Sequence, residues 1–228
     1  TTAHVGAIGM AVNAENQTQG YINYGPLDEV NFDTVDFTIE GFAKSNYNDG
    51  WWWHSILGNF VGGSAGSWSV FVSNDTSNRV VFLVEGQAPI YTTSEVDNGW
   101  FHFAVSRNGD VLRIFVNGVM EAKVTGWASK VVGHATRDFV VGGNNTGTRD
   151  RWRGYLDELR ITKGVGRYDS DASISVPGLG YPRGVAADPD WNSVTYLIGF
   201  EDEFADDSPA SLAPLLPVAQ RPSAAKFG

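Results

Sequence analysis

One stretch, residues 98–125, constrains the fold more strongly than any other part of the chain. Three runs rich in β-branched and aromatic residues are separated there by the dipeptides Asn108-Gly109 and Asn117-Gly118. Asn-Gly is well suited to the two positive-φ positions of a type I′ hairpin turn. Apolar residues alternate with polar or small ones over residues 100–106, so one face of these strands should be buried. The stretch therefore predicts a three-stranded antiparallel meander with one core face.

Short strand patterns recur along the rest of the chain, with turn-forming residues between them. Residues 36–44 alternate as a strand with one buried face does, and residues 67–73 and 79–84 predict a hairpin across a polar turn. We count about a dozen such strands and no convincing helical pattern. This organisation indicates an all-β sandwich or jelly roll and argues against an alternating α/β sheet.

Three motifs resemble laminin-G-like domains of the concanavalin A-like superfamily. The meander resembles the family signature of a Trp-x-His strand, an Arg-x-Gly turn and a strand ending in Asn-Gly. Residues 36–42 resemble an early Phe-Thr-Ile-Glu strand, and residues 154–168 resemble the closing strand in the form common in bacteriophage structural proteins. The similarity covers roughly residues 5–170. It implies a concanavalin A-like jelly-roll sandwich of two antiparallel sheets.

Composition limits the possible functions. A chain of 228 residues can form one large β domain, and its 13% aromatic content supplies a core. Because the chain has no Cys, disulfides, thiolate metal sites and a Cys nucleophile are excluded. The formal net charge of −10 argues against a nucleic-acid partner. No apolar stretch reaches membrane-spanning length, so we expect no membrane insertion.

We expect three parts: a jelly-roll core at residues 1–168, a Pro/Gly/Ser-rich linker or wrapping loop at 169–193, and a tail at 194–228. The tail resembles the first strand and acidic turn of a jelly-roll repeat. It could open a truncated second repeat, reflect a circular permutation, or fill a vacant slot in a neighbouring copy. An empty slot would expose an unpaired sheet edge, so we expect residues 194–200 to complete a sheet in cis or between subunits.

An acidic run in the tail, residues 201–207, is a candidate metal site. Carboxylate oxygens are the hard ligands that Ca²⁺ prefers, and the resemblance implies Ca²⁺ at the corresponding turn. The alternative is a solvated, charged turn that discourages edge pairing. If Ca²⁺ binds, we expect Asp202, Asp206 and Asp207 as ligands and Asp157 as a distant contributor. No other cofactor is required.

A glycoside hydrolase on this fold would need two carboxylates that flank the sugar. The retaining glucanases of the superfamily carry them on a Glu-x-Asp-x-x-Glu strand, which is absent here. Asp157 and Glu158 are adjacent, so they should face opposite sides of a strand. We therefore expect a protein that is not an enzyme.

Aromatic side chains in a β-sandwich cleft can stack against sugar rings. Three consecutive indoles at residues 51–53 cannot share one face of a strand, so an exposed one would need a reason such as a glycan or a partner subunit. For any single Trp elsewhere, core packing is the alternative. The candidate glycan-binding residues are Trp51, Trp52, Trp53, Asn144, Asn145 and Trp152.

The resemblance suggests a first functional hypothesis, a non-catalytic virion-surface module of a bacteriophage. It would act in a tail fibre, head fibre or decoration protein, for adhesion or assembly. Its partners would be other virion proteins, copies of itself in a homo-oligomer, and a host-surface polysaccharide. The second hypothesis is a carbohydrate-binding lectin module of a secreted bacterial protein, and the third is a glycan-cleaving enzyme.

Overall fold

The computed structural model describes residues 21–45, 53–73, 77–144, 150–178, 180–200, 206–214 and 216–217. These residues form two antiparallel sheets. The seven-stranded sheet has the order β13 (Leu216–Pro217), β1 (Ile22–Pro26), β10 (Asp138–Val141), β3 (Trp53–Gly58), β4 (Trp68–Ser73), β5 (Arg79–Val84) and β6 (Ile90–Tyr91). The six-stranded sheet has the order β12 (Val194–Ile198), β11 (Gly154–Lys163), β2 (Phe37–Ser45), β7 (Trp100–Asn108), β8 (Val111–Val116) and β9 (Val119–Thr125).

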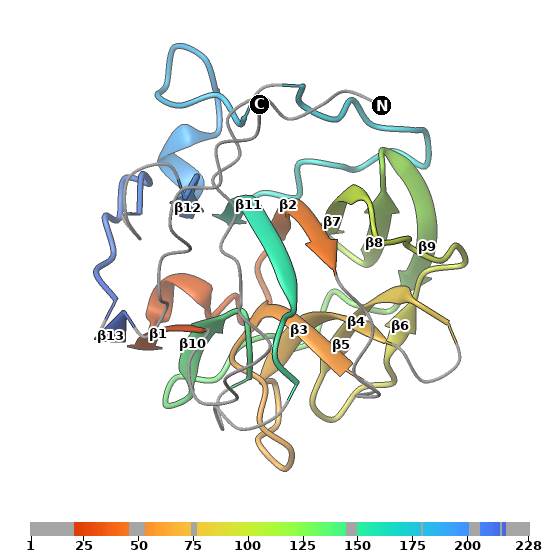
Figure 1. Cartoon of the computed structure of the whole chain (residues 1–228), viewed down its shortest axis with the longest axis horizontal. Coiled ribbons are helices and arrows are strands. Elements are labelled where there is room, and N and C mark those ends of the chain that lie inside the picture. The colour runs from red at the N-terminus through yellow and green to blue at the C-terminus, as the bar shows by residue number, and fades with distance from the viewer. Residues whose placement is uncertain are drawn as a thin grey trace.

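The expected all-β sandwich is confirmed, and its strands follow from the period-two patterns (Figure 1). Alternate residues of β7, β8, β4 and β5 enter one continuous apolar core between the sheets. Within it the rings of Phe32 and Phe37 are stacked at 4.4 Å, and Trp68 lies 5.4 Å from Phe32. The described helical turns are only the short 3₁₀ segments η1 (Asp28–Val30) and η2 (Trp191–Ser193).

The meander at residues 98–125 forms as expected, but only one of its turns has the expected position. Val116 pairs with Val119, and Asn117 and Gly118 between them have φ values of 49° and 82°, which fits a type I′ turn. In the other turn Asn108 still belongs to β7 and pairs with Val111. The two-residue loop is therefore Gly109-Asp110, in which only Gly109 has positive φ, as in type II′ turns.

The tail strand lies within the same molecule. β12 pairs antiparallel with β11, with Leu159 opposite Ile198 and Ile161 opposite Tyr196. The Tyr196 hydroxyl donates a hydrogen bond of 3.1 Å to the Tyr24 hydroxyl, across the core from β1. The described part of the tail therefore occupies an edge of the six-stranded sheet in cis. The division of the chain at residues 168 and 193 stays a prediction.

A segment between β11 and η2 covers the outer face of the six-stranded sheet. We call residues 164–190, apart from residue 179, the strap. In Figure 1 it leaves β11, passes along the side of β7 to β9 and returns toward β12. Its residues bond to successive strands: Tyr168 N to the Ser106 hydroxyl, Asp171 to Arg113, and Ile174 N to the Gly118 carbonyl. Over β2, β7 and β11 the outer face of the sheet is consequently buried as well as its core face, whereas the edge strand β9 stays partly exposed.

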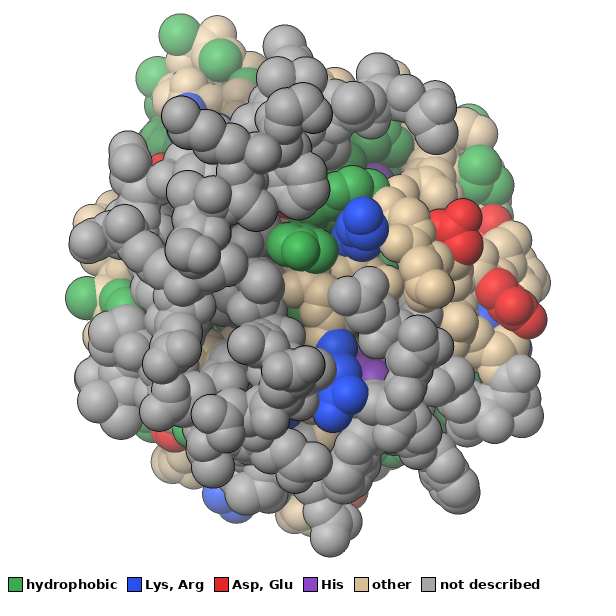
Figure 2. Space-filling model, viewed as in Figure 1, with side chains coloured by type: hydrophobic (Ala, Val, Ile, Leu, Met, Phe, Trp, Pro, Cys, Tyr) green, Lys and Arg blue, Asp and Glu red, His purple; other side chains and the backbone are tan. Residues whose placement is uncertain are grey.

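The surface of the described residues carries charges of both signs. In Figure 2, basic side chains lie near the middle of the visible face and acidic ones toward its right margin. Among the helical segments of the described chain, none has the length and apolar character that a membrane span would need.

Candidate functional site

Two places in the molecule concentrate chemistry-bearing side chains, and the first lies under the strap. On the outer face of the six-stranded sheet, Glu40 accepts hydrogen bonds from Arg160 at 2.8 and 2.9 Å and from the Tyr168 hydroxyl at 2.6 Å. Arg160 also pairs with Asp188 of the strap at 3.1 Å. We call this group the buried ionic cluster; its members are Glu40, His102, Arg160, Arg167, Tyr168, Tyr181 and Asp188.

Aromatic rings complete the buried ionic cluster. The Arg160 guanidinium lies over the ring of Tyr181, 4.0 Å from its centroid. The Tyr181 hydroxyl is 3.1 Å from His102 Nε2, which in turn lies 3.8 Å from a Glu40 oxygen. Tyr181 is held in place because its backbone N–H donates to Glu158 at 2.7 Å. Strand and strap side chains therefore bond to one another, and His102 Nδ1 is the member atom left without a partner within the described chain.

The electrostatics of the cluster fix its charge states. Burial alone would raise the pKa of Glu40, but the Arg160 guanidinium and the bonds donated to the carboxylate outweigh it and lower that pKa to about 2. Burial would likewise raise the pKa of Asp188, and its bonds to Arg167 hold it below its ordinary value. For Tyr168, burial and the adjacent Glu40 both raise the pKa. The cluster is thus an ionised pair network with protonated tyrosines.

The buried ionic cluster has the residue types of an active site, but a substrate cannot reach it. Glu40 is 0% exposed, and Asp188 and His102 are each 1% exposed. A glycosidase needs two carboxylates on either side of a sugar, whereas here both carboxylates bind the same Arg160. Substrate could reach them only if the strap left the sheet. The geometry supports a structural role for these groups.

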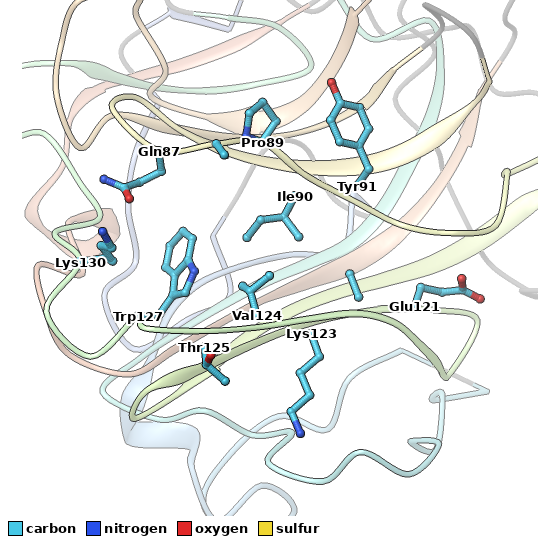
Figure 3. A pocket seen from close by; sticks show the side chains of 12 residues that line it. Gln87, Pro89, Ile90, Tyr91, Glu121, Lys123, Val124, Thr125, Trp127 and Lys130 are labelled. Carbon is cyan, nitrogen blue, oxygen red and sulfur yellow. The ribbon is translucent and has the colours of Figure 1, made fainter.

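The second place is open to solvent, at the edge of the sandwich. A pocket of about 600 Å³ lies between β6, the last strand of one sheet, and β9, the last strand of the other (Figure 3). We call it the edge pocket. Its lining residues come from β6 and the turn before it, and from β9 and the loop after it: Gln87, Ala88, Pro89, Ile90, Tyr91, Glu121, Ala122, Lys123, Val124, Thr125, Trp127 and Lys130.

The loop at one end of the edge pocket is held rigidly. The Asp110 carboxylate accepts backbone bonds from Gly126 at 3.0 Å and from Ala128 at 3.2 Å. These bonds lower the pKa of Asp110. The buried Arg107 donates to the Lys130 carbonyl at 2.7 Å, and Lys130 N donates to the Trp127 carbonyl at 3.1 Å. The backbone that carries Trp127 and Lys130 is therefore preorganised.

The floor of the edge pocket is apolar, with polar groups around it. Figure 3 shows Ile90, Val124 and Trp127 directed toward one another, while Gln87 and Lys130 lie at the Trp127 end. Trp127 is 6% exposed, and its indole N–H finds no acceptor within the described chain. The Gln87 side chain likewise makes no hydrogen bond to a described residue. The pocket thus retains hydrogen-bonding capacity beside an apolar surface.

Glu121 closes the opposite end of the edge pocket. Its carboxylate accepts bonds from the hydroxyl of Thr93 and from the N–H and hydroxyl of Ser94, the latter two at 3.0 Å. Partial burial would raise the pKa of Glu121, but these bonds lower it. Because Thr93 follows β6 and Glu121 belongs to β9, the contact joins the edges of the two sheets. It keeps the width of the pocket fixed.

This arrangement suits binding. The volume of the edge pocket lies within the range of roughly 300–1,000 Å³ that is typical of small-ligand sites. An apolar floor with a few directed polar groups can hold a ligand that has one apolar face and several hydroxyls. The carboxylate lining the pocket, Glu121, is already engaged by Thr93 and Ser94. Among the described lining residues there is accordingly no pair of free carboxylates for glycoside hydrolysis.

The glycan-binding residues expected from the sequence do not gather in the edge pocket. Trp51, Trp52 and Asn145 lie outside the described residues. Trp53 is half-buried, and its ring stacks on Phe71 at 4.8 Å. Asn144 donates a bond of 2.6 Å to Asp150.

Trp152 requires a correction. It is 0% exposed within the core, and its indole N–H donates to the Tyr155 carbonyl at 3.3 Å. The indole therefore has no face to offer a sugar, and core packing, the alternative that the sequence left open, describes it. Residue 152 precedes β11 by two positions, and its indole nevertheless lies between the two sheets.

The described residues of the expected Ca²⁺ site already bind groups of the protein. Both oxygens of Asp206 are occupied by the N–H groups of Leu197, Ser208 and Leu212 and by the Ser208 hydroxyl, at 2.7 to 3.0 Å. Asp207 pairs with Arg183 at 3.1 Å.

The other two expected ligands add no support for this site. Asp157 is buried on β11, and Asp202 lies outside the described residues. No group of three or more metal-ligating side chains occurs in the described chain. Ca²⁺ binding stays a prediction.

Sequence reasoning missed Gln87, Trp127 and Lys130. Gln87 follows β5 and the other two follow β9, so the sequence does not show that they share a pocket. A partial signal was available. Trp127 directly follows Gly126 at the end of an amphipathic edge strand, where an indole lies near the border between core and solvent.

Comparisons with solved structures agree on the fold. A candidate carbohydrate-binding protein from Bacteroides ovatus ATCC 8483 matches with a TM-score of 0.56 at 14% identity, over 86% of this chain and 59% of that one. The CBM40 of the Ruminococcus gnavus IT-sialidase, bound to α2,3-sialyllactose, matches with a TM-score of 0.50 at 13% identity, over 59% of this chain and 79% of that one. This chain therefore spans less than two thirds of the length of the first of these proteins.

A third match is the full-length tailspike protein 2 of the Escherichia coli O157:H7 bacteriophage CAB120, with a TM-score of 0.53 at 9% identity, over 89% of this chain and 28% of that one. No curated protein matches the chain. Residues 16–165 match the family described as the concanavalin A-like lectin/glucanases superfamily. This match covers most of the chain and agrees with the two-sheet fold, so the chain belongs to the concanavalin A-like lectin/glucanase superfamily.

Proposed function

We propose that the chain is a non-catalytic carbohydrate-binding module whose sugar site is the edge pocket. The observation that carries the proposal is the pairing of an apolar floor with unused donors, the Trp127 N–H and the Gln87 amide, on a lectin-type fold. A sugar ring has an apolar C–H face and a rim of hydroxyls, which matches such a lining. Two structural neighbours named for carbohydrate binding support the proposal.

The absence of catalysis is part of the proposal and rests on access. The acid–base groups of the buried ionic cluster are sealed under the strap, and Glu121 in the edge pocket is held by Thr93 and Ser94. Retaining hydrolysis would need two carboxylates about 5–5.5 Å apart on either side of the sugar. Release of reducing ends from a bound polysaccharide would contradict this part of the proposal.

A pair of matched substitutions tests the site. Trp127→Phe keeps an aromatic ring in the floor and removes the indole N–H, so sugar affinity should fall by about 5- to 10-fold, the value of one hydrogen bond. Trp53→Phe is the control, because Trp53 stacks on Phe71 away from the edge pocket. Affinity is measured by calorimetry with a polysaccharide retained from an immobilised panel, after thermal melts verify folding.

The two variants also decide between sites. If Trp53→Phe weakens binding and Trp127→Phe does not, the sugar binds near the tryptophans at residues 51–53, as the sequence suggested, and the edge pocket is excluded. Equal affinity of both variants and the wild type would exclude both indole sites.

A second proposal concerns the setting of the module, a virion surface of a bacteriophage. It is favoured by the tailspike match, which covers 89% of this chain, and by the phage-like closing strand at residues 154–168. In that setting, copies of the chain would associate with one another or with other virion proteins and would adhere to a host polysaccharide. A secreted bacterial lectin module is the alternative, with an extracellular location.

Native mass separates these settings. A virion appendage should give a mass of several chains at low micromolar concentration, because such assemblies are symmetric homo-oligomers. A single-chain mass, together with retention on a polysaccharide, would favour the secreted lectin module instead.

A further inference from the structure

The charged side chains that line the edge pocket are not equivalent. Glu121 is engaged by Thr93 and Ser94. Lys123 pairs with Asp171 of the strap at 2.6 Å, and Figure 3 shows its side chain extending away from the floor. The ammonium group of Lys130 has no carboxylate within ion-pairing distance among the residues that the structure describes.

The Lys130 ammonium is therefore the uncompensated charge of the pocket. Three described lysines, Lys44, Lys130 and Lys163, have no carboxylate partner within the described chain, and Lys130 is the one of these that lines the pocket. Its backbone is fixed by the bonds to Trp127 and Arg107, so the base of the side chain cannot move away from the pocket. Lys130 is half-buried, which strengthens its interaction with an opposite charge relative to bulk water.

Two further groups that can donate hydrogen bonds lie at the same end. Gln87 carries a free amide beside Lys130 in Figure 3, and the Trp127 indole N–H opens on the floor. An ammonium, an amide and an indole N–H together form a donor set for an oxyanion, while Ile90 and Val124 supply the apolar surface for a ring. The carboxylate of the pocket, that of Glu121, lies at the far end.

We propose that the edge pocket selects a sugar that carries an anionic substituent, a carboxylate, sulfate or phosphate, bound by Lys130 with Gln87 and Trp127. This inference rests on the proposed carbohydrate-binding function of the same pocket. Lys130 determines specificity, and the floor supplies affinity for the ring. Neutral sugars bind the same floor more weakly.

The test compares sugars that differ only in charge. Calorimetry at low ionic strength is run with methyl glucoside, methyl glucuronide, glucose 6-sulfate and glucose 6-phosphate, and with neutral and uronate oligosaccharides. At least one anionic sugar should bind about tenfold more tightly than its neutral counterpart, and the difference should shrink at high salt. The three anionic probes distinguish carboxylate, sulfate and phosphate as the group that is read.

Variants assign the effect to one side chain. Lys130→Met should reduce the tenfold preference to less than twofold and leave affinity for the neutral sugar unchanged, while Lys130→Arg should retain most of it. Lys123→Met is the matched control, because it removes the pocket's other lysine, which is held by Asp171 together with Arg113 and extends away from the floor, and it should retain the preference.

The failures are distinguishable. Equal affinity for neutral and anionic sugars, or a preference that persists in Lys130→Met, overturns the charge selection and leaves the proposed function standing. If neither neutral nor anionic sugars bind, the proposed function itself fails.

Discussion

The outer face of the six-stranded sheet and the open edge of the sandwich contain the same kinds of side chains, and they differ in what is left for a ligand. Under the strap, Glu40, Arg160 and Asp188 bind one another and are buried. In the edge pocket, the Lys130 ammonium and the Trp127 N–H have no partner in the described chain. Residue types alone would have favoured the first place as the functional site.

The comparison teaches that unused bonding capacity and access, more than composition, distinguish a binding site from a structural network. A buried network whose carboxylates and guanidinium groups are paired specifies how the strap sits on the sheet. A preorganised pocket with free donors can exchange its water for a ligand. Substitutions in the buried ionic cluster should change the stability of the fold, and substitutions in the edge pocket should change ligand binding.

The largest expected effect follows from Arg160. Arg160→Met leaves the buried carboxylates of Glu40 and Asp188 without their shared cation, so the free energy of unfolding should fall by about 3–5 kcal/mol. Urea denaturation measures it. Sugar affinity of the folded variant should remain that of the wild type. A loss below about 1 kcal/mol would mean that the cluster does not secure the strap.

The same cluster predicts an acid-sensitive fold. The pKa of Glu40 is lowered from its ordinary 4.5 to about 2, so the folded state binds fewer protons than the unfolded state in this range. The contribution of Glu40 to stability is therefore full above pH 4.5 and is lost as the pH falls toward about 2. Urea midpoints between pH 2 and 7 should decline less steeply in Glu40→Gln. An equally steep decline would show that other carboxylates carry the acid sensitivity.

A smaller effect is expected at Asp206, which lies outside both regions. Asp206→Ala leaves the buried N–H of Leu197 without an acceptor and should cost about 1–3 kcal/mol in urea denaturation. Because the Asp206 oxygens are already occupied, melting temperatures in Ca²⁺ and in EDTA should be equal. A rise with Ca²⁺ that Asp206→Ala abolishes would restore the metal site that the sequence suggested.

The smallest effect is expected at Lys123. Its pair with Asp171 is largely exposed, so Lys123→Met should change the free energy of unfolding by less than about 1 kcal/mol. It should also leave sugar affinity within twofold of the wild type. A loss of affinity for anionic sugars as large as that in Lys130→Met would mean that both lysines bind the anionic group, although Lys123 pairs with Asp171.

The meander shows what the sequence could predict. Its strands follow from period-two alternation, and the turn at Asn117-Gly118 follows from residues that tolerate positive φ. These are local properties of the chain. The neighbouring turn was misplaced by one residue because the Asn108 side chain bonds to the Gly166 carbonyl, a tertiary contact that keeps Asn108 in the strand.

The buried ionic cluster and the edge pocket could not be predicted, because both depend on contacts between residues that lie far apart in the sequence. Thr38 and Glu40 alternate with core residues as solvent-facing residues do, and only the strap shows that they are buried. The edge pocket requires knowing that β6 and β9, the terminal strands of different sheets, lie opposite each other. Which strands of the two sheets face each other produces no periodic pattern in a single sequence.

The strap has a consequence for the order in which the molecule can be completed during synthesis. Glu40 is synthesised early, and Tyr168, whose hydroxyl donates a hydrogen bond to the Glu40 carboxylate, lies 128 residues later. Until the ribosome has released that part of the chain, the first strands of the six-stranded sheet carry an acid with no counterpart. Contacts so distant in sequence close slowly. A fragment trimmed to residues 16–165 would retain the family match and lack this closure permanently, so it should aggregate or be degraded where the longer chain persists.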